Sequence, residues 1–174
     1  HLDYFADMSV DTRQSMIDGF DVYRDIVAVN QIPSSYFVLG ELINPMASVL
    51  RQLAESGADI GVHGWSHRRP LLMEPLELKK DLMKTKKILE DVIGKPVLGY
   101  RAPCYSLDRD RLDVVRDVGF VYDSSRIIFE EHPLYGTLDM HGFIEQIPNV
   151  YRANDFFEFQ LSTLPFAGFN VPIS

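Results

Sequence analysis

Short apolar runs alternate with longer amphipathic stretches along most of this chain, and no other feature of the sequence restricts its fold as strongly. The apolar runs have the length of buried strands and occupy residues 36–39, 59–62, 97–100 and 120–122. Between and before them, apolar side chains recur every three or four residues, as in an amphipathic helix, over residues 12–29, 45–56, 75–93 and 109–118. This order predicts an α/β fold, a mainly parallel sheet or barrel with strands inside and helices outside.

Proline and glycine residues indicate where several of these elements begin and end. Asn44-Pro45 predicts a helix start, since asparagine is a favourable N-cap and proline fits the first helical turn. Pro75 opens the next long helix, and Gly94 ends it. Beyond residue 125 the pattern fades, and we expect a loop over 126–142 and two strand-like pieces near 143–147 and 156–161.

Length and chain ends define the expected domain organisation. A chain of 174 residues is long enough for one domain with its own core. No linker or low-complexity tract divides it, so we expect a single domain over residues 1–174. Because the sequence begins at His1 without a methionine and stops at Ser174 in a strand-like piece, we expect this domain to lack parts of both ends.

Charge and cysteine content exclude several classes of protein. The formal net charge of −8 disfavours a nucleic-acid partner, because so acidic a chain offers little to offset phosphate charge. A single cysteine, Cys104, excludes a disulfide scaffold. No apolar run approaches the roughly 18 residues of a membrane span, and the first residues do not form a signal peptide. The default compartment is therefore the cytoplasm, and the alternative is an exported protein whose leader is missing from this sequence. The sequence does not indicate the oligomeric state.

Two histidines after the second apolar run form the strongest local motif. His63 and His67 are four residues apart, a spacing that presents two imidazoles to one cation. A set of two histidines and a carboxylate suits a divalent metal with an open water position, and zinc is the default. Asp3 is the candidate carboxylate. The alternatives are a pair of capping or core histidines and a solvated terminal aspartate.

A second motif, Arg101-Ala102-Pro103-Cys104-Tyr105, follows the third apolar run. Arg101 either holds a carboxylate through a bidentate pair or lies at the surface before a turn. Backbone N–H groups after Pro103 are candidates to face a ligand oxygen. We interpret Cys104 as a small apolar residue rather than a nucleophile, because no base is evident beside it.

Other polar and aromatic residues have both functional and structural interpretations. Asp123 follows the fourth apolar run, and it either joins the site at the carboxyl ends of the strands or caps a helix. Trp65 is either a sugar platform or a packing residue. His132 and His141, in the loop-rich part, are candidate acids or exposed loop residues.

The order of these motifs resembles that of a known family. His63-Gly-Trp-Ser-His67 resembles the metal motif of the polysaccharide deacetylases, the NodB-homology carbohydrate esterases of family 4, and Arg101-Ala-Pro103-Cys-Tyr105 resembles their Arg-x-Pro motif. The segments around them, from about residue 34 to 125, are similar to those of the lineage found with genes for the assembly of O-antigen (the polysaccharide of lipopolysaccharide), capsule and exopolysaccharide.

The resemblance implies a distorted (β/α) barrel and metal-dependent removal of acetyl groups from N-acetyl sugars. It implies that Asp3, His63 and His67 hold the metal. It also implies that the N–H of Cys104 binds the oxyanion beside the metal. Pro103, Tyr105 and Trp65 are grouped with Cys104 as candidate substrate-site residues.

Two further roles follow from the resemblance, and two family features are missing. Arg101 would tether the catalytic aspartate, and Asp123 would orient a general acid. The first family motif usually has two acidic residues, whereas here Asp3 is accompanied by His1. The leucine-histidine pair that supplies the general acid is also not visible.

Three hypotheses about function follow. The first is a carbohydrate N-deacetylase acting on a bacterial surface polysaccharide or its precursor, with an N-acetylated glycan as its partner. The second is hydrolysis of another non-peptide C–N bond on the same scaffold. The third is a catalytically silent homologue that binds glycan, for which the missing acidic residue is the main support.

Overall fold

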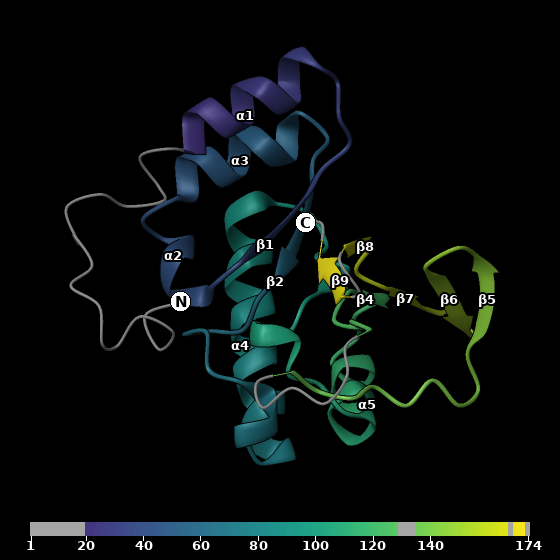
Figure 1. The fold of residues 1–174 in the computed structure, drawn as a ribbon. Coiled ribbons are helices and arrows are strands. Elements are labelled where there is room, and N and C mark those ends of the chain that lie inside the picture. Colours follow the sequence, from purple (N-terminus) through teal and green to yellow (C-terminus); the bar gives the residue numbers. More distant parts are fainter. Residues whose placement is uncertain (1–19, 129–134, 167–168, 173–174) are drawn as a thin grey trace, which may run out of the picture. The chain divides into compact units, whose positions relative to one another are not determined.

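The computed structural model describes residues 20–128, 135–166 and 169–172. It consists of two compact units, of which the first ends at Ser35 and the second extends from Tyr36 to Ser174. Helix α1 (Phe20–Val29) belongs to the first unit. The elements that carry the candidate site belong to the second (Figure 1).

A mixed seven-stranded sheet forms the centre of the second unit, with the strand order β1-β2-β3-β4-β7-β6-β5. Strands β2, β3, β4 and β7 pair in parallel, whereas β7, β6 and β5 pair antiparallel. A separate antiparallel pair, β8 and β9, follows. The strands are β1 (Ser35–Val38), β2 (Asp59–Val62), β3 (Gly99–Tyr100), β4 (Tyr122–Asp123), β5 (Ile144–Ile147), β6 (Val150–Ala153), β7 (Phe156–Phe159), β8 (Thr163–Phe166) and β9 (Phe169–Pro172).

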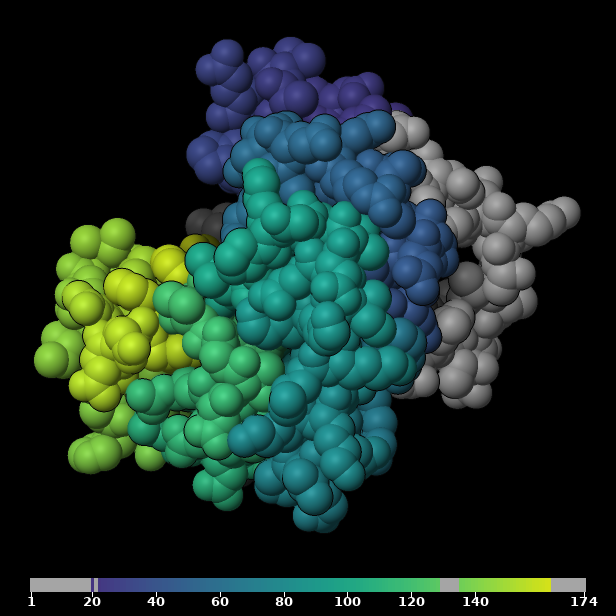
Figure 2. Space-filling view, turned by 180° about the vertical axis from the view of Figure 1, so that it is seen from behind, coloured from purple at the N-terminus to yellow at the C-terminus, as the bar shows by residue number. Residues whose placement is uncertain are grey.

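Helices connect the parallel strands. Figure 2 shows the outer side of this layer, where the teal surface of α4 lies between the blue of α3 and the green of α5, and α4 contacts both. Short 3-10 turns precede α4 and α5. The helices of the second unit are α2 (Gly40–Ile43), α3 (Ala47–Glu55), α4 (Pro75–Ile93) and α5 (Arg109–Asp117), and the 3-10 turns are Pro70–Leu72 and Pro103–Tyr105.

The apolar positions of the elements between residues 36 and 123 form the core, which confirms their helical and strand periods. Of the helix expected over 12–29, α1 forms residues 20–29, its Tyr23 is exposed, and residues 12–19 lie outside the described residues. Each of the helices α3, α4 and α5 buries one apolar stripe, and most residues of β2 and β3 are buried. The core side chains include Leu50, Leu53, Ile60, Val62, Leu78, Leu82, Leu89, Tyr100, Leu112 and Val115. The expected alternation of parallel strands and outer helices is therefore confirmed for residues 36–123.

The helix start predicted at Asn44-Pro45 is wrong. The chain forms α2 directly after β1, and Asn44 ends that helix in a right-handed helical conformation instead of capping a new one. The reason is tertiary: the N–H groups of Gly40 and Glu41 donate to the carbonyls of Gly64 and Trp65. These bonds fix the first turn of α2 beside the histidine motif, and α3 starts only at Ala47.

The C-terminal half differs from the expectation in two details. The strand-like pieces near 143–147 and 156–161 are β5 and β7, but β6 between them escaped the sequence pattern. The fourth apolar run becomes a strand only at Tyr122, so that Asp123 is part of β4. Within the residues that the structure describes, no helix has both the length and the apolar composition needed to cross a bilayer.

Candidate functional site

The site residues expected after the strands lie side by side at one edge of the sheet. The N–H of His63 donates to the carbonyl of Val38 in β1 (2.9 Å), and the N–H of Arg101 donates to Val62 in β2 (3.0 Å). The N–H of Ser124 continues the ladder to Tyr100 in β3 (3.0 Å). The carboxyl ends of β2, β3 and β4 therefore place His63, Arg101 and Asp123 next to one another, as the sequence predicted.

The two histidines of the first motif face each other from an irregular loop. Their ring centroids are 5.0 Å apart, with the planes inclined by 65°. The loop turns because Gly64 and His67 have left-handed backbones, with φ of 76° and 60°. A Cβ at Gly64 would lie 3.5 Å from the ring of Pro103, so the two sequence motifs pack against each other.

The hydrogen bonding of His63 determines which ring nitrogen is available. Its Nδ1 lies 2.8 Å from the carbonyl oxygen of Arg101. A carbonyl only accepts, so Nδ1 carries the hydrogen and Nε2 keeps its lone pair. Burial, together with the nearby charges of His67 and Arg101, lowers the pKa of His63 to about 4 despite that hydrogen bond. A neutral imidazole oriented by a backbone carbonyl is the usual form of a metal ligand.

The donor set fits part of a divalent metal site. Two neighbouring imidazoles, one of them fixed in its tautomer, suit zinc and similar ions. Asp3, the expected third ligand, lies outside the described residues. Over 20–128, 135–166 and 169–172, no three histidine, cysteine or acidic side chains gather as ligands. Of the three expected ligands, the described part contains His63 and His67, whose role as ligands remains a prediction.

Arg101 binds the loop after β4. Its Nε donates to the carbonyl of Ser124 (3.0 Å) and one Nη to the hydroxyl of Ser124 (2.7 Å). Its guanidinium also lies 4.5 Å from the ring centre of Phe37. The side chain is half-buried and held on both sides, unlike a loose surface arginine. The tether to a catalytic aspartate remains a prediction, because the chain has His1 rather than a second acidic residue beside Asp3.

The turn after Arg101 has a strained backbone. Cys104 and Tyr105 have φ of 53° and 51°, in the left-handed region that L residues seldom adopt. The N–H of Tyr105 bonds to Ala102 (3.0 Å), and the N–H of Ser106 bonds to Pro103 (3.1 Å). These two bonds close the turn that carries the backbone N–H of Cys104.

Trp65 packs within the protein. A Cβ added to Gly40 would overlap its ring, and the ammonium of Lys84 lies 3.1 Å from its ring centre. Its backbone N–H donates to a carboxylate oxygen of Asp81 (3.0 Å) on α4. This placement fits the packing interpretation, and the sugar-platform role remains a prediction. Asp81 was not identified in the sequence, because its position on α4 is that of an ordinary surface residue.

Asp123 is fully buried and caps no helix in the described segment that follows it. Its carboxylate accepts from the N–H of Ser125 (2.9 Å) and from the hydroxyl of Ser125 (2.7 Å). Burial raises its pKa in spite of these bonds. Beside it lies Glu158 of β7, also fully buried and paired in register with Asp123. Sequence reasoning missed Glu158, since only the parallel pairing of β4 with β7 reveals it.

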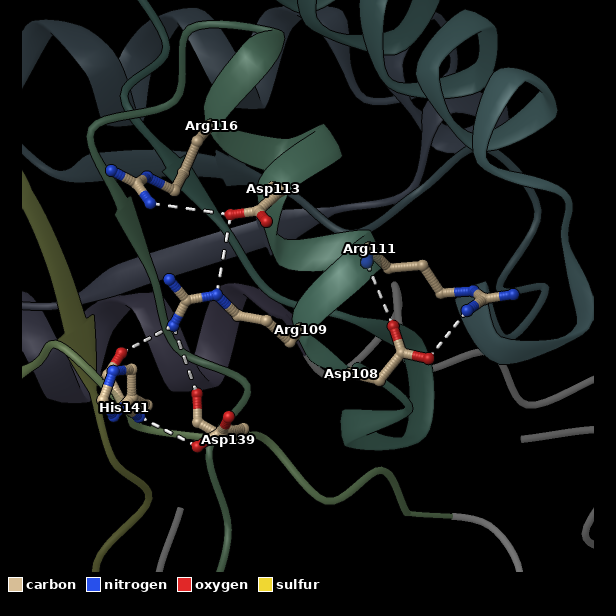
Figure 3. Close-up of polar contacts among 7 residues, drawn as sticks. All are labelled: Asp108, Arg109, Arg111, Asp113, Arg116, Asp139 and His141. Carbon is tan, nitrogen blue, oxygen red and sulfur yellow. Dashed lines mark hydrogen bonds and ion pairs between the residues drawn. The ribbon is translucent and has the colours of Figure 1, made fainter.

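His141 does not join the described site. His141 is exposed, and its carbonyl accepts from Arg109 of α5 (2.9 Å), which also contacts the carbonyl of Asp139 (Figure 3). Arg111 of the same helix bonds to Asp108, which caps α5 (Figure 3). Helix α5 thus anchors this loop. His132 lies outside the described residues.

Comparison with known proteins gives a consistent family match. A family model described as polysaccharide deacetylase matches residues 19–122. The peptidoglycan deacetylase of Helicobacter pylori is 27% identical over 104 residues, which are 60% of this chain and 36% of that protein. The chain therefore spans little more than a third of the length of that relative.

Solved structures share the fold at lower identity. A protein from Mycobacterium smegmatis assigned to the polysaccharide deacetylases has a TM-score of 0.61 at 23% identity, over 79% of this chain and 43% of that one. A pseudoenzyme of carbohydrate esterase family 4 from Bacillus anthracis has a TM-score of 0.53 at 15% identity, over 56% and 37% of the two chains. These similarities, together with the parallel strands and outer helices, confirm the expected distorted (β/α) barrel.

Proposed function

Because the chain belongs to the polysaccharide deacetylase family, we propose that it is a metal-dependent hydrolase that removes N-acetyl groups from sugar residues of a bacterial surface polysaccharide or of its precursor. The observation that carries the proposal is the oriented pair of imidazoles, with His63 fixed by the carbonyl of Arg101 at 2.8 Å and facing His67. Such a pair is suited to a catalytic metal, which keeps an open coordination position.

The proposed metal ligands are His63, His67 and Asp3, with zinc as the default ion. These residues would hold a divalent ion, which would supply Lewis-acid polarisation of the acetamide carbonyl and activation of a water. The reaction adds one water to the amide carbon, breaks the C–N bond, and releases acetate and the free amine of the sugar.

Other residues of the chain bind and orient the substrate in this proposal. The N–H of Cys104, in the left-handed turn after Pro103, donates to the developing oxyanion, with Tyr105 beside it. Arg101 holds the turn against the loop after β4. Asp123 keeps that loop in place and orients the general acid. Trp65 contributes by holding the histidine loop against α2.

Metal content and acetate release test the proposal together. The purified protein is loaded with zinc, and its metal content is measured by elemental mass spectrometry. Acetate release is then followed with N-acetylglucosamine oligomers and with peptidoglycan glycan strands. We expect about one equivalent of metal and acetate release in the wild type, and the loss of both in His63→Ala/His67→Ala. His141→Ala, which removes an exposed histidine outside the described site, is the matched control for metal content.

Each other outcome selects a different hypothesis. Metal binding without acetate release from any N-acetyl sugar favours a silent homologue that binds glycan. Metal-dependent hydrolysis of cyclic amides in place of N-acetyl sugars favours the other C–N hydrolase. A wild type that takes up no divalent metal overturns the metal-hydrolase proposal.

A further inference from the structure

Two buried carboxyl groups, those of Asp123 and Glu158, lie together at the edge of the sheet that carries the candidate site. Asp123 ends β4, Glu158 lies opposite it on β7, and both side chains are fully buried. Both accept from the same backbone N–H, that of Ser125, at 2.9 Å for Asp123 and 3.1 Å for Glu158. A shared donor requires the two carboxyl groups to be close neighbours.

We propose that Glu158 is a positioning residue for the candidate site and that it acts as an uncharged carboxylic acid, donating a hydrogen bond to Asp123. Glu158 lies beyond the part of the chain that matches the family model, residues 19–122. The inference rests on the proposed function only where it predicts how Glu158 affects catalysis. The hydrogen-bonded arrangement itself has consequences that need no turnover.

The distribution of donors assigns the proton to Glu158. Both oxygens of Asp123 accept, one from the N–H and one from the hydroxyl of Ser125. Oε1 of Glu158 accepts from the N–H groups of Ser125 and Arg126 (2.8 Å for Arg126). Oε2 of Glu158 is buried and receives no hydrogen bond from any described residue. It is the one oxygen of the pair without a donor, and a proton there removes the deficit.

Burial and mutual repulsion favour one negative charge on the Asp123–Glu158 pair rather than two. Two buried carboxylates in contact repel, and removing both from water is costly. On β3, the neighbouring titratable group is the buried hydroxyl of Tyr100, which carries no positive charge. The guanidinium of Arg126 lies over the ring of Tyr151, 4.4 Å from its centre. Burial and repulsion by Asp123 accordingly raise the pKa of Glu158 well above its ordinary value.

A path of hydrogen bonds, joined through the peptide unit between Arg101 and Ala102, leads from this pair to His63. The hydroxyl of Ser125 donates to Asp123 (2.7 Å) and accepts from the N–H of Ala102 (2.8 Å). The adjacent Ser124 holds the Arg101 side chain. The carbonyl of Arg101 in turn fixes Nδ1 of His63. Glu158 therefore positions both the turn proposed to bind the oxyanion and one proposed metal ligand.

Two substitutions separate the neutral acid from a charged carboxylate. In Glu158→Gln, the amide oxygen accepts from Ser125 and Arg126 while the amide nitrogen donates to Asp123, as the neutral acid does. Glu158→Leu fills the space but makes neither bond. Phe156→Leu, on the same strand and also buried, is the control for lost stability without loss of this network.

The first readouts are spectroscopic and need no activity. We expect a protonated-carboxyl infrared band at pH 7 in the wild type and in Phe156→Leu, and its loss in Glu158→Gln. We expect the NMR signal of the His63 Nδ1–H to be unchanged in Glu158→Gln and in Phe156→Leu, and shifted in Glu158→Leu. A wild type without the band, or a band that persists in Glu158→Gln, overturns the assignment of the proton.

Kinetics then test the positioning role. We expect kcat to fall at least about tenfold in Glu158→Leu with KM little changed, since a displaced oxyanion donor costs that much or more. Glu158→Gln is expected to stay within about threefold of the wild type. Equal damage by both substitutions, or an unchanged His63 signal in Glu158→Leu, overturns the inference. A protein inactive on every N-acetyl sugar but with the expected spectra overturns the proposed function alone.

Discussion

At the scale of single residues, the proposed role of Cys104 depends on its backbone and not on its thiol. Its φ of 53° lies in the left-handed region, which costs an L residue about 1–2 kcal/mol and a β-branched residue more. The proposed role uses only its backbone N–H. We therefore expect Cys104→Gly to keep acetate release within about threefold, and Cys104→Val to lower the free energy of unfolding by about 1–2 kcal/mol.

Urea unfolding and acetate release measure these two effects. If the thiol were a nucleophile, Cys104→Gly would abolish turnover, and that result would contradict the role given to the backbone. Cys104→Ser is the matched control, because it keeps the Cβ and nearly the size of the side chain while removing the sulfur.

Asp81 controls the loop between the two proposed metal ligands. Its carboxylate accepts from the N–H of Trp65 at 3.0 Å, midway between His63 and His67 in the sequence. Removing such a supporting group typically weakens metal affinity by about 10- to 100-fold. We expect Asp81→Ala to weaken zinc binding by about tenfold in a competition titration, and Asp81→Asn, which keeps an acceptor, to weaken it less.

The matched control for Asp81 lies on the same helix. Asp91 of α4 is exposed and pairs with Lys87, so Asp91→Ala removes an equal charge far along the helix from the loop. If Asp91→Ala weakened zinc binding as much as Asp81→Ala, the effect would be one of net charge and not of loop geometry.

At the scale of elements, the pairing of β4 with β7 makes stability depend on pH. Burial and the neighbouring Asp123 raise the pKa of Glu158 in the folded protein. The folded state holds this proton more tightly than the unfolded chain, whose glutamate pKa is about 4.3. The stabilisation is therefore complete below the unfolded pKa and is lost as the pH rises through the folded pKa.

Glu158→Gln has no such proton to lose. We expect the free energy of unfolding of Glu158→Gln, relative to the wild type, to increase with pH above about 4.3, by at most about 1.4 kcal/mol per pH unit. Urea unfolding at a series of pH values measures this difference. Parallel curves for the two proteins, or a difference that falls with rising pH, would show that Glu158 is ionised in the folded state.

The same elements indicate how far local sequence patterns reach. The periods of residues 75–93 and 109–118 gave α4 and α5 nearly to the residue, because each helix buries one regular apolar stripe. Asn44-Pro45 misled because hydrogen bonds donated by Gly40 and Glu41 to the carbonyls of Gly64 and Trp65, distant in sequence, fix α2 just before it. Glu158 escaped because its neighbours are phenylalanines, and its partner Asp123 is 35 residues away. Local chemistry located the motifs, whereas contacts between distant strands supply the residues that support them.

At the scale of the whole molecule, metal binding is expected to couple to folding. A ligand that binds only the folded state stabilises it by RT ln(1 + [L]/Kd), about 2.7 kcal/mol when the ligand concentration is 100 times Kd. We expect zinc to raise the Tm of the wild type and to leave that of His63→Ala/His67→Ala unchanged. The third proposed ligand, Asp3, allows a separate test, because Asp3→Ala is expected to reduce the shift while both histidines remain.

The acidic surface makes this comparison demanding, because a protein with a formal charge of −8 attracts cations without any specific site. The double histidine variant controls for this nonspecific binding. Histidines count as neutral in the formal charge, so their removal leaves the net charge at −8. Any zinc effect shared by the wild type and the variant is then surface binding, and raising the salt concentration should suppress it. Only a shift that is confined to the wild type and persists at high salt belongs to the site formed by His63 and His67, and equal shifts in both proteins would contradict that site.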